Sequence, residues 1–192
     1  MKNLMLVLVL LVSGIGYSQE NPAKMIDKNP EVYKLTDDDW DNLNSFYVSE
    51  LNVDSLSQEV FKIFNEYRRY VGIHELVFDT TLQKAADIQA KYCLSIREST
   101  HIQKNNPTMK TPPMRLKSVD PKGKLSFEGE ISSQDVYMST IIRKRTLSQN
   151  ILDLFYFSSF HRKIIEDIES TKIGISIYVD GSQIYTVVVF GK

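Results

Sequence analysis

Apolar residues recur at helical spacing in two neighbouring segments in the middle of the chain. Ser57 could cap the first segment and Gly72 could end it, and its apolar positions are Val60, Phe61, Phe64, Tyr67 and Val71. Asp79 or Thr80 could cap the second, whose apolar stripe is Leu82, Ala85, Ala86 and Cys93. Positions three and four apart share one face of a helix. The pattern therefore predicts two helices packed on a shared core.

The last twenty residues have the period of a β-hairpin. Apolar side chains alternate with small or polar ones from Ile173 to Val179, and Asp180-Gly181 supplies turn chemistry. An apolar run follows from Ile184 to Phe190. A continuous apolar run is typical of a strand that is buried on both faces. We expect a hairpin whose second strand lies inside the sheet.

The segments before this hairpin are less regular. Residues 125–132 alternate weakly and could form a strand or an extended edge, whereas residues 148–157 return to helical spacing. Ser158 or Ser159 could cap the turn that follows.

Residues 102–124 differ in composition from the rest of the chain, because four of the six prolines lie there. Proline removes a backbone donor, so the segment is predicted to be a long loop. Its basic residues are Lys104, Lys110, Arg115, Lys117, Lys122 and Lys124, against Asp120 alone. Such a loop could attract an anionic ligand, or it could simply be a solvated surface.

The N-terminus has the pattern of a secretory signal. Lys2 precedes an apolar run from Leu4 to Val12, and small residues lead to a predicted cut near Ser18. The run is too short to span a bilayer, so we expect no transmembrane anchor and a secreted or periplasmic protein. A buried N-terminal strand is the alternative interpretation of residues 1–18.

Residues 19–56 form a predicted acidic extension. Between Gln19 and Glu59 there are ten acidic residues against three lysines. Thr36 and the three aspartates after it could begin a short helix that carries Trp40, Leu43, Tyr47 and Leu51 on one face. The acid cluster could cap that helix and be solvated, or it could hold a cation.

Composition excludes several classes of protein. Loss of Lys2 with the signal would change the formal charge from -1 to -2, and nothing in this balance indicates nucleic-acid binding. Cys93 is the only cysteine, so no intramolecular disulfide can form. Its place in an apolar stripe predicts a buried, unreactive thiol.

Two of the three histidines lie on either side of a candidate carboxylate along the chain. His101 ends a Ser-Thr-His run, His161 follows an aromatic segment, and Glu130 lies between them. Imidazole and carboxylate groups could together bind a cation or move protons. Their spacing alone demonstrates neither function.

These residues sit in an ordered set of motifs. The set comprises Asn65-x-x-Arg68, Leu76-x-Phe78-Asp79-x-x-Leu82-x-x-Ala85-Ala86, Ser99-x-His101, Gly129-Glu130, an aromatic-x-x-Ser158-x-x-His161-Arg162 segment and Ile173-Gly174. That order resembles the CAP superfamily of cysteine-rich secretory, antigen 5 and pathogenesis-related proteins. It is similar to the compact bacterial form of this SCP-like extracellular domain, over about two thirds of the chain.

The resemblance implies an α+β fold, a CAP-like α-β-α sandwich with a small, mostly antiparallel sheet between helical layers. The CAP-like domain would span residues 57–192, and its cavity would be lined by His101, Glu130 and His161, with Ser158 as a further ligand-binding residue. Relatives carry a second carboxylate before the last histidine, where this chain has Ser158 and Ser159. Asp153 is a candidate replacement. His74 is expected to be a surface or capping residue.

The leading hypothesis is a secreted binding module whose groove takes a lipid or sterol, an anionic ligand, a divalent cation or an extracellular protein partner. The alternative is a metal-assisted hydrolase or peptidase, in which His101 and His161 hold a metal such as zinc and Glu130 acts as ligand or general base. A third hypothesis is a structural extracellular protein without catalytic activity. A Ser158 nucleophile with His161 lacks the sequence context of known serine hydrolases.

Overall fold

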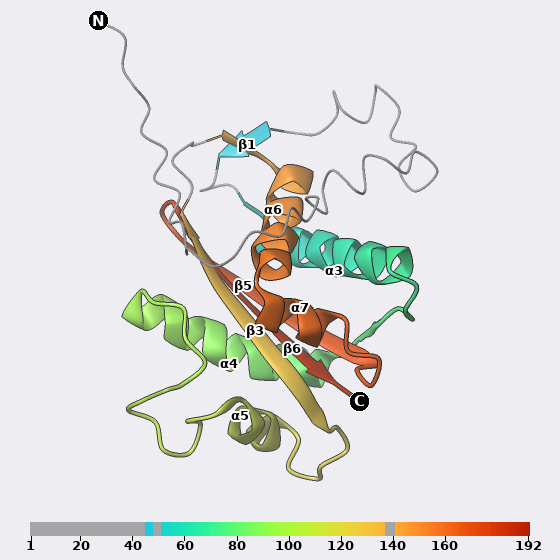
Figure 1. Ribbon diagram of the computed structural model, residues 1–192. Coiled ribbons are helices and arrows are strands. Elements are labelled where there is room, and N and C mark those ends of the chain that lie inside the picture. Colours follow the sequence, from blue (N-terminus) through green and yellow to red (C-terminus); the bar gives the residue numbers. More distant parts are fainter. Residues whose placement is uncertain (1–44, 48–50, 137–140) are drawn as a thin grey trace, which may run out of the picture.

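The computed structural model describes residues 45–47, 51–136 and 141–192 (Figure 1). In these ranges it contains five helices, which are α3 (Val53–Tyr70), α4 (Thr80–Ile96), α5 (Pro112–Val119), α6 (Lys144–Phe157) and α7 (Ser159–Ile165). The strands are β1 (Ser45–Tyr47), β2 (Val77–Phe78), β3 (Phe127–Val136), β4 (Ile141–Arg143), β5 (Lys172–Asp180) and β6 (Gln183–Gly191). The predicted α+β class is confirmed.

The main sheet has the strand order β2-β5-β6-β3. Its β5-β6 and β6-β3 pairs are antiparallel, and the short β2 is parallel to β5. The predicted C-terminal hairpin is confirmed, with Asp180 opposite Gln183 and Gly181 at φ 60° in the turn. The inner position of β6 explains its unbroken apolar run, because both of its faces are covered. β1 and β4 form a separate two-stranded sheet.

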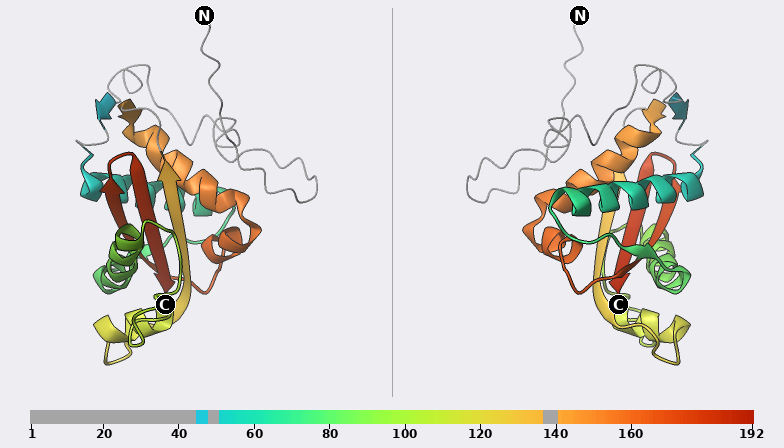
Figure 2. Two further views of the ribbon diagram at one scale, coloured as in Figure 1. Left: turned by 90° about the vertical axis from the view of Figure 1, so that its left-hand side faces the viewer. Right: turned by 90° about the vertical axis from the view of Figure 1, so that its right-hand side faces the viewer.

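Helices cover both faces of the main sheet (Figure 2). On one face α3 and α6 pack over the side chains of Ile131, Ile175 and Val188. On the other face α4 and α5 pack over Val187 and Val189. This arrangement is the predicted sandwich of helical layers around a small, mostly antiparallel sheet.

The helix α4 lies unusually close to the sheet at Gly174. A Cβ atom added to this glycine would stand 2.0 Å from the backbone nitrogen of Gln83. Only a residue without a side chain fits there, which is why the first turn of α4 can rest on the backbone of β5.

Cap residues place the two long helices. The Asp79 side chain accepts hydrogen bonds from the first backbone N–H groups of α4, as predicted. The predicted Ser57 cap is wrong, because Asn52 caps α3 and the helix begins at Val53. Ser57 is instead buried, and its hydroxyl donates to the Ile175 carbonyl at 3.4 Å. The helix therefore starts inside the predicted extension.

Two further predictions need correction. The segment 102–124 is not entirely loop, since α5 occupies Pro112–Val119 with proline in its first turn. Proline has the backbone angle of a helix and no N–H that would need a partner there, so it favours this start. Ser45–Tyr47 is a strand and does not continue a helix to Leu51.

Other predictions about the N-terminus concern residues that the structure does not describe. The signal peptide of residues 1–18 and the rest of the acidic segment up to residue 44 lie outside the described ranges. None of the described helices is long and apolar enough to cross a membrane.

Candidate functional site

The candidate site lies around β3, the strand at one edge of the main sheet. Glu130 is on β3, His101 is in the connection between α4 and α5, and His161 is in α7. Both α5 and α7 contact β3. Chain segments from opposite helical layers thus meet beside this strand, which brings together two histidines that are sixty residues apart.

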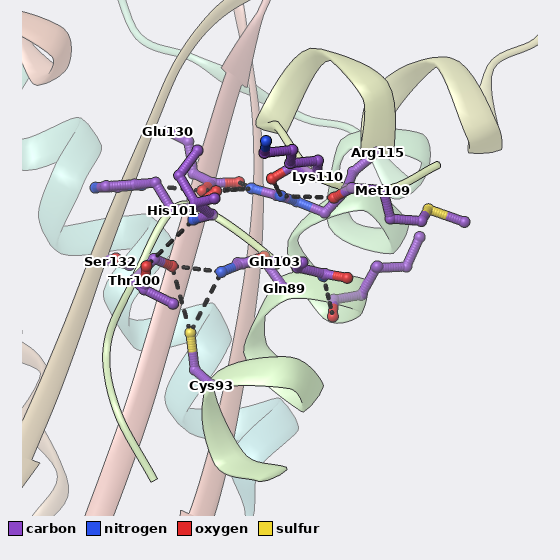
Figure 3. A network of polar contacts seen from close by, with 12 residues as sticks. Gln89, Cys93, Thr100, His101, Gln103, Met109, Lys110, Arg115, Glu130 and Ser132 are labelled. Carbon is purple, nitrogen blue, oxygen red and sulfur yellow. Dashed lines mark hydrogen bonds and ion pairs between the residues drawn. The ribbon is translucent and has the colours of Figure 1, made fainter. Parts of the chain in front are cut away.

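The Glu130 carboxylate is buried and accepts hydrogen bonds from two other side chains (Figure 3). Arg115 Nη2 lies 2.8 Å from both carboxylate oxygens, and His101 Nδ1 lies 3.0 Å from Oε1. The Arg115 side chain is fully buried, whereas the His101 side chain is 36% exposed. Glu130 therefore joins an internal cation to an imidazole that reaches solvent.

Arg115 was predicted to be one of six surface cations, and the structure corrects this. Its Nη1 donates to the Met109 and Lys110 carbonyls, and its Nη2 also donates to the His101 carbonyl. A buried cation needs such compensation, because removing it from water is costly. Sequence analysis missed this residue, and a lone arginine two positions after Pro113 carries no pattern that distinguishes it from a surface charge.

A second hydrogen-bond network holds the connection between α4 and α5, which carries His101. Gln89 in α4 donates to the Thr100 carbonyl, and its side-chain oxygen accepts from Gln103 at 3.1 Å. Both glutamines are buried. Cys93 is also buried, as predicted, and burial raises the pKa of its thiol. These contacts give His101 a supported backbone on either side.

The hydrogen-bond chemistry indicates the tautomer of His101. A carboxylate that faces an arginine is ionised and can only accept hydrogen bonds. Nδ1 of His101 must then carry the proton that it shares with Glu130. In its neutral form this imidazole keeps its lone pair on Nε2, where it can accept a hydrogen bond or bind a cation.

His161 stands close to His101 and to two aromatic rings. The imidazole centroids are 6.3 Å apart, and the rings of Phe155 and Phe160 lie 5.5 and 6.0 Å from that of His161. Burial lowers the pKa of His161, and the neighbouring His101 lowers it further. His161 therefore favours its neutral form, which also has a lone pair.

Ser158 and Asp153 have local roles within the helices. The Ser158 hydroxyl accepts from the backbone N–H of His161 at 3.4 Å and caps α7, as predicted. Asp153 accepts from Gln149 at 3.4 Å, one turn earlier in α6, and burial raises its pKa. His74 is exposed, and its Nε2 lies 3.0 Å from the Ser170 carbonyl. It is a surface residue, as expected.

The donor set does not fit a zinc site with Glu130 as a ligand. Both oxygens of that carboxylate already face Arg115, whose positive charge would also repel a metal ion. Within the described ranges, no group of three His, Cys, Asp or Glu side chains could hold a metal ion. The Glu130 carboxylate therefore serves Arg115 and His101 and is not available to a metal ion.

The α+β sandwich is the fold that the resemblance to CAP domains predicted. The model of the family described as CAP, the cysteine-rich secretory protein family, matches residues 61–190. This range is more than half of the chain, and the chain belongs to this family. No curated protein matches the sequence significantly.

Several solved structures share the fold at low sequence identity. An outer surface protein from Borrelia burgdorferi aligns with a TM-score of 0.58 and 20% identity, over 74% of this chain and 96% of its own. An extracellular SCP-domain protein from Bacillus anthracis gives 0.54 and 19%, over 83% of this chain and 45% of its own. The CAP domain of enterococcal PrgA gives 0.51 and 16%, over 88% and 74%.

Proposed function

We propose that this protein is a secreted binding module that holds an amphipathic ligand, a lipid or sterol with a free hydroxyl, at the histidine pair. The observation that carries this proposal is the convergence of His101 and His161, with ring centroids 6.3 Å apart. His161, and His101 in its neutral form, offer lone pairs to the proton of a hydroxyl group. Glu130 orients one of the two rings and does not contact the ligand.

Exposed apolar side chains next to the histidines support the amphipathic character of the ligand. Phe157 and Phe160 are 60% and 66% exposed, at the end of α6 and the start of α7. Leu154, one turn before Ser158, is also exposed. Large apolar side chains that gather at the surface often mark a site of binding. Phe160 lies against the His161 ring, with centroids 6.0 Å apart, so a ligand with one polar end suits both.

The signal-like residues 1–18 and the extracellular or outer-surface origin of two similar structures support export of the chain. N-terminal sequencing of the exported protein checks this part of the proposal. A protein that begins near Gln19 is expected, and one that begins at Met1 would contradict it.

Sterol binding tests the site directly. A fluorescent sterol with a free 3-hydroxyl is titrated into the protein, alongside its 3-acetate, which lacks the donor proton. We expect at least tenfold weaker binding of the acetate, and a similar loss for the free sterol in the His101→Ala, His161→Ala double variant. His74→Gln is the matched control, because it alters the one remaining histidine outside the site. Equal binding of sterol and acetate, or no effect of the double variant, would refute the proposal.

A cation held by the two imidazoles alone, without Glu130 as a ligand, is the second candidate function. A histidine backed by a carboxylate, as His101 is by Glu130, is typical of metal ligands. Calorimetric titration with zinc alone distinguishes the two. Binding of one zinc per chain that is lost in the double variant, together with no sterol binding, would favour the cation.

A further inference from the structure

Among the described residues, one side of the strand β5 has no strand partner over most of its length. One side of β5 pairs with β6 from Lys172 to Asp180. On the other side β2 pairs only with Lys172 and Ile173. No other described strand pairs with β5, so from Gly174 onward the side that faces away from β6 has no strand partner among the described residues. An open edge presents unpaired backbone groups to any extended segment that approaches it.

Two contacts show which backbone groups point outward. The Ile173 carbonyl accepts from the backbone N–H of Asp79 in the connection after β2, at 2.8 Å, and the Ile175 carbonyl accepts from Ser57. The N–H and C=O groups of one residue point to the same side of a strand, and successive residues alternate. The backbone groups of Ile177 and Val179 therefore also point away from β6, toward the open edge.

A groove runs along this edge between the two helical layers. It consists of two adjoining hollows of about 480 and 330 Å³, which share Asp54, Ser57 and Gln83 in their linings. The helices α3 and α4 flank it from opposite faces of the sheet (Figure 2). The smaller hollow is lined by the residues of β5 from Ile175 to Val179. The groove thus leads directly to the free edge.

The groove has an apolar end and an acidic rim. Phe61 and Phe78 line the larger hollow and pack edge to face, with centroids 5.6 Å apart. Asp54 is exposed on the rim and forms no ion pair with another described residue. Asp87 also lies on the rim but is engaged by Lys91 at 2.8 Å and by the Tyr178 hydroxyl at 2.7 Å. Among the described residues, no cation pairs with Asp54, which makes it the rim carboxylate suited to a cationic partner.

We propose that this groove binds an extended peptide segment of another protein, which adds as a strand to β5 and carries a lysine or arginine opposite Asp54 and an apolar residue over Phe61 and Phe78. Strand addition of this kind uses backbone hydrogen bonds for affinity and alternate side chains for specificity. The site is separate from the histidine pair, and it does not depend on the function proposed for that pair.

The acidic rim of the groove favours a basic peptide over two other possible occupants, the N-terminal stretch of the same chain and a second copy of the chain. The N-terminal stretch of the same chain, from Gln19 to Asn44, carries seven acidic residues against three lysines, so an acidic rim repels it. A second copy of the chain, paired edge to edge, would set two acidic rims close together. Like charges brought together in this way oppose binding. A basic segment has the complementary sign.

A blocked eight-residue peptide that alternates lysine with valine tests the proposal. Its binding to the full chain is followed by amide chemical shifts and fluorescence anisotropy. We expect the largest shifts at the backbone amides of Ile177 and Val179. A matched peptide with glutamate in place of each lysine should bind at least tenfold more weakly. Equal binding of the two peptides, no binding of the lysine peptide at millimolar concentration, or shifts centred on β3 would overturn the proposal.

Three variants of the protein sharpen the result. Asp54→Lys should weaken binding of the lysine peptide about tenfold by reversing the rim charge. Glu128→Lys makes the same change in net charge on β3, at the opposite edge of the sheet, and should leave binding unchanged. Val179→Pro removes an outward N–H that β6 does not use, and proline is tolerated on edge strands. It should also weaken binding about tenfold, and if it fails to fold, Asp54→Lys alone decides.

Self-association is the remaining outcome. Sedimentation of the free protein shows whether copies pair through β5. A dimer that protects the amides of Ile177 and Val179 from exchange, and that the lysine peptide does not dissociate, would overturn the proposed occupant.

Discussion

The two faces of the main sheet provide different hydrogen-bond partners for a buried carboxylate. Glu130 and Asp135 both lie on β3 and are 5% and 7% exposed. Their positions differ by an odd number, so they point to opposite faces. Glu130 faces α5, where Arg115 and His101 donate to it. Asp135 shares the face of Ile131, and among the described residues only the Ser133 hydroxyl donates to it, at 3.2 Å.

The difference shows what burial requires of a charge. Burial raises the pKa of Asp135 from its ordinary 3.8 to about 7, and the Ser133 hydrogen bond offsets only part of this. On the other face, helix α5 supplies the buried Arg115 as a partner for the Glu130 carboxylate. The α5 face therefore stabilises the Glu130 carboxylate through hydrogen bonds from Arg115 and His101. The opposite face disfavours the charged form of Asp135.

The largest expected effect comes from removing the cation of the α5 face. Arg115→Met leaves the Glu130 carboxylate buried beside a single imidazole, and loss of one partner from a buried pair costs about 3–5 kcal/mol. Urea denaturation measures the free energy of unfolding. The double variant Arg115→Met, Glu130→Leu should recover most of the loss, because no buried charge remains. A single variant as stable as the wild type would show that the pair contributes nothing.

Asp135→Asn should change how stability depends on pH. Because the folded pKa lies above the unfolded one, the native state binds the proton more tightly, and stability falls as pH rises from about 4 to 7. At 1.36 kcal/mol per pKa unit the wild type should be less stable than the variant by roughly 4 kcal/mol above pH 8, and similar to it near pH 4. Thermal unfolding across this range tests the sign. A difference that does not vary with pH would contradict it.

Gln89→Leu probes the network that holds the segment around His101. It removes the donor to the Thr100 carbonyl and the acceptor for Gln103, and unsatisfied buried groups cost about 1–3 kcal/mol. Hydrogen exchange should become faster at residues 100–103 and stay unchanged in β5. Uniformly faster exchange throughout the domain would mean that the network does not act locally.

The smallest expected effect is on the titration of His161. Since burial and then His101 lower its pKa, its NMR midpoint should lie below 6.5, and its contribution to stability is lost as pH falls through that region. His101→Gln should raise the midpoint but leave it below 6.5, because burial is the larger cause. A midpoint at or above 6.5 in the wild type would place His161 in water.

Much of the fold could be predicted because its signals are local. Alternation from Ile173 to Val179 and the turn at Gly181 define the hairpin, and Asp79 lies where its carboxylate caps α4. The family was recognisable from the order of short motifs. Residues 1–18 carry the pattern of a signal peptide, and export stays a prediction.

Tertiary structure decided the rest, because it depends on pairs that are distant along the chain. Nothing near Arg115 indicates that a basic residue of a proline-rich segment is buried against Glu130, fifteen positions later. Ser57 is a residue type that often caps a helix, but its hydroxyl donates to the Ile175 carbonyl of β5. Asn52 caps α3 instead. Residue types determine what each group can bond to, and only the folded chain brings the partners within reach.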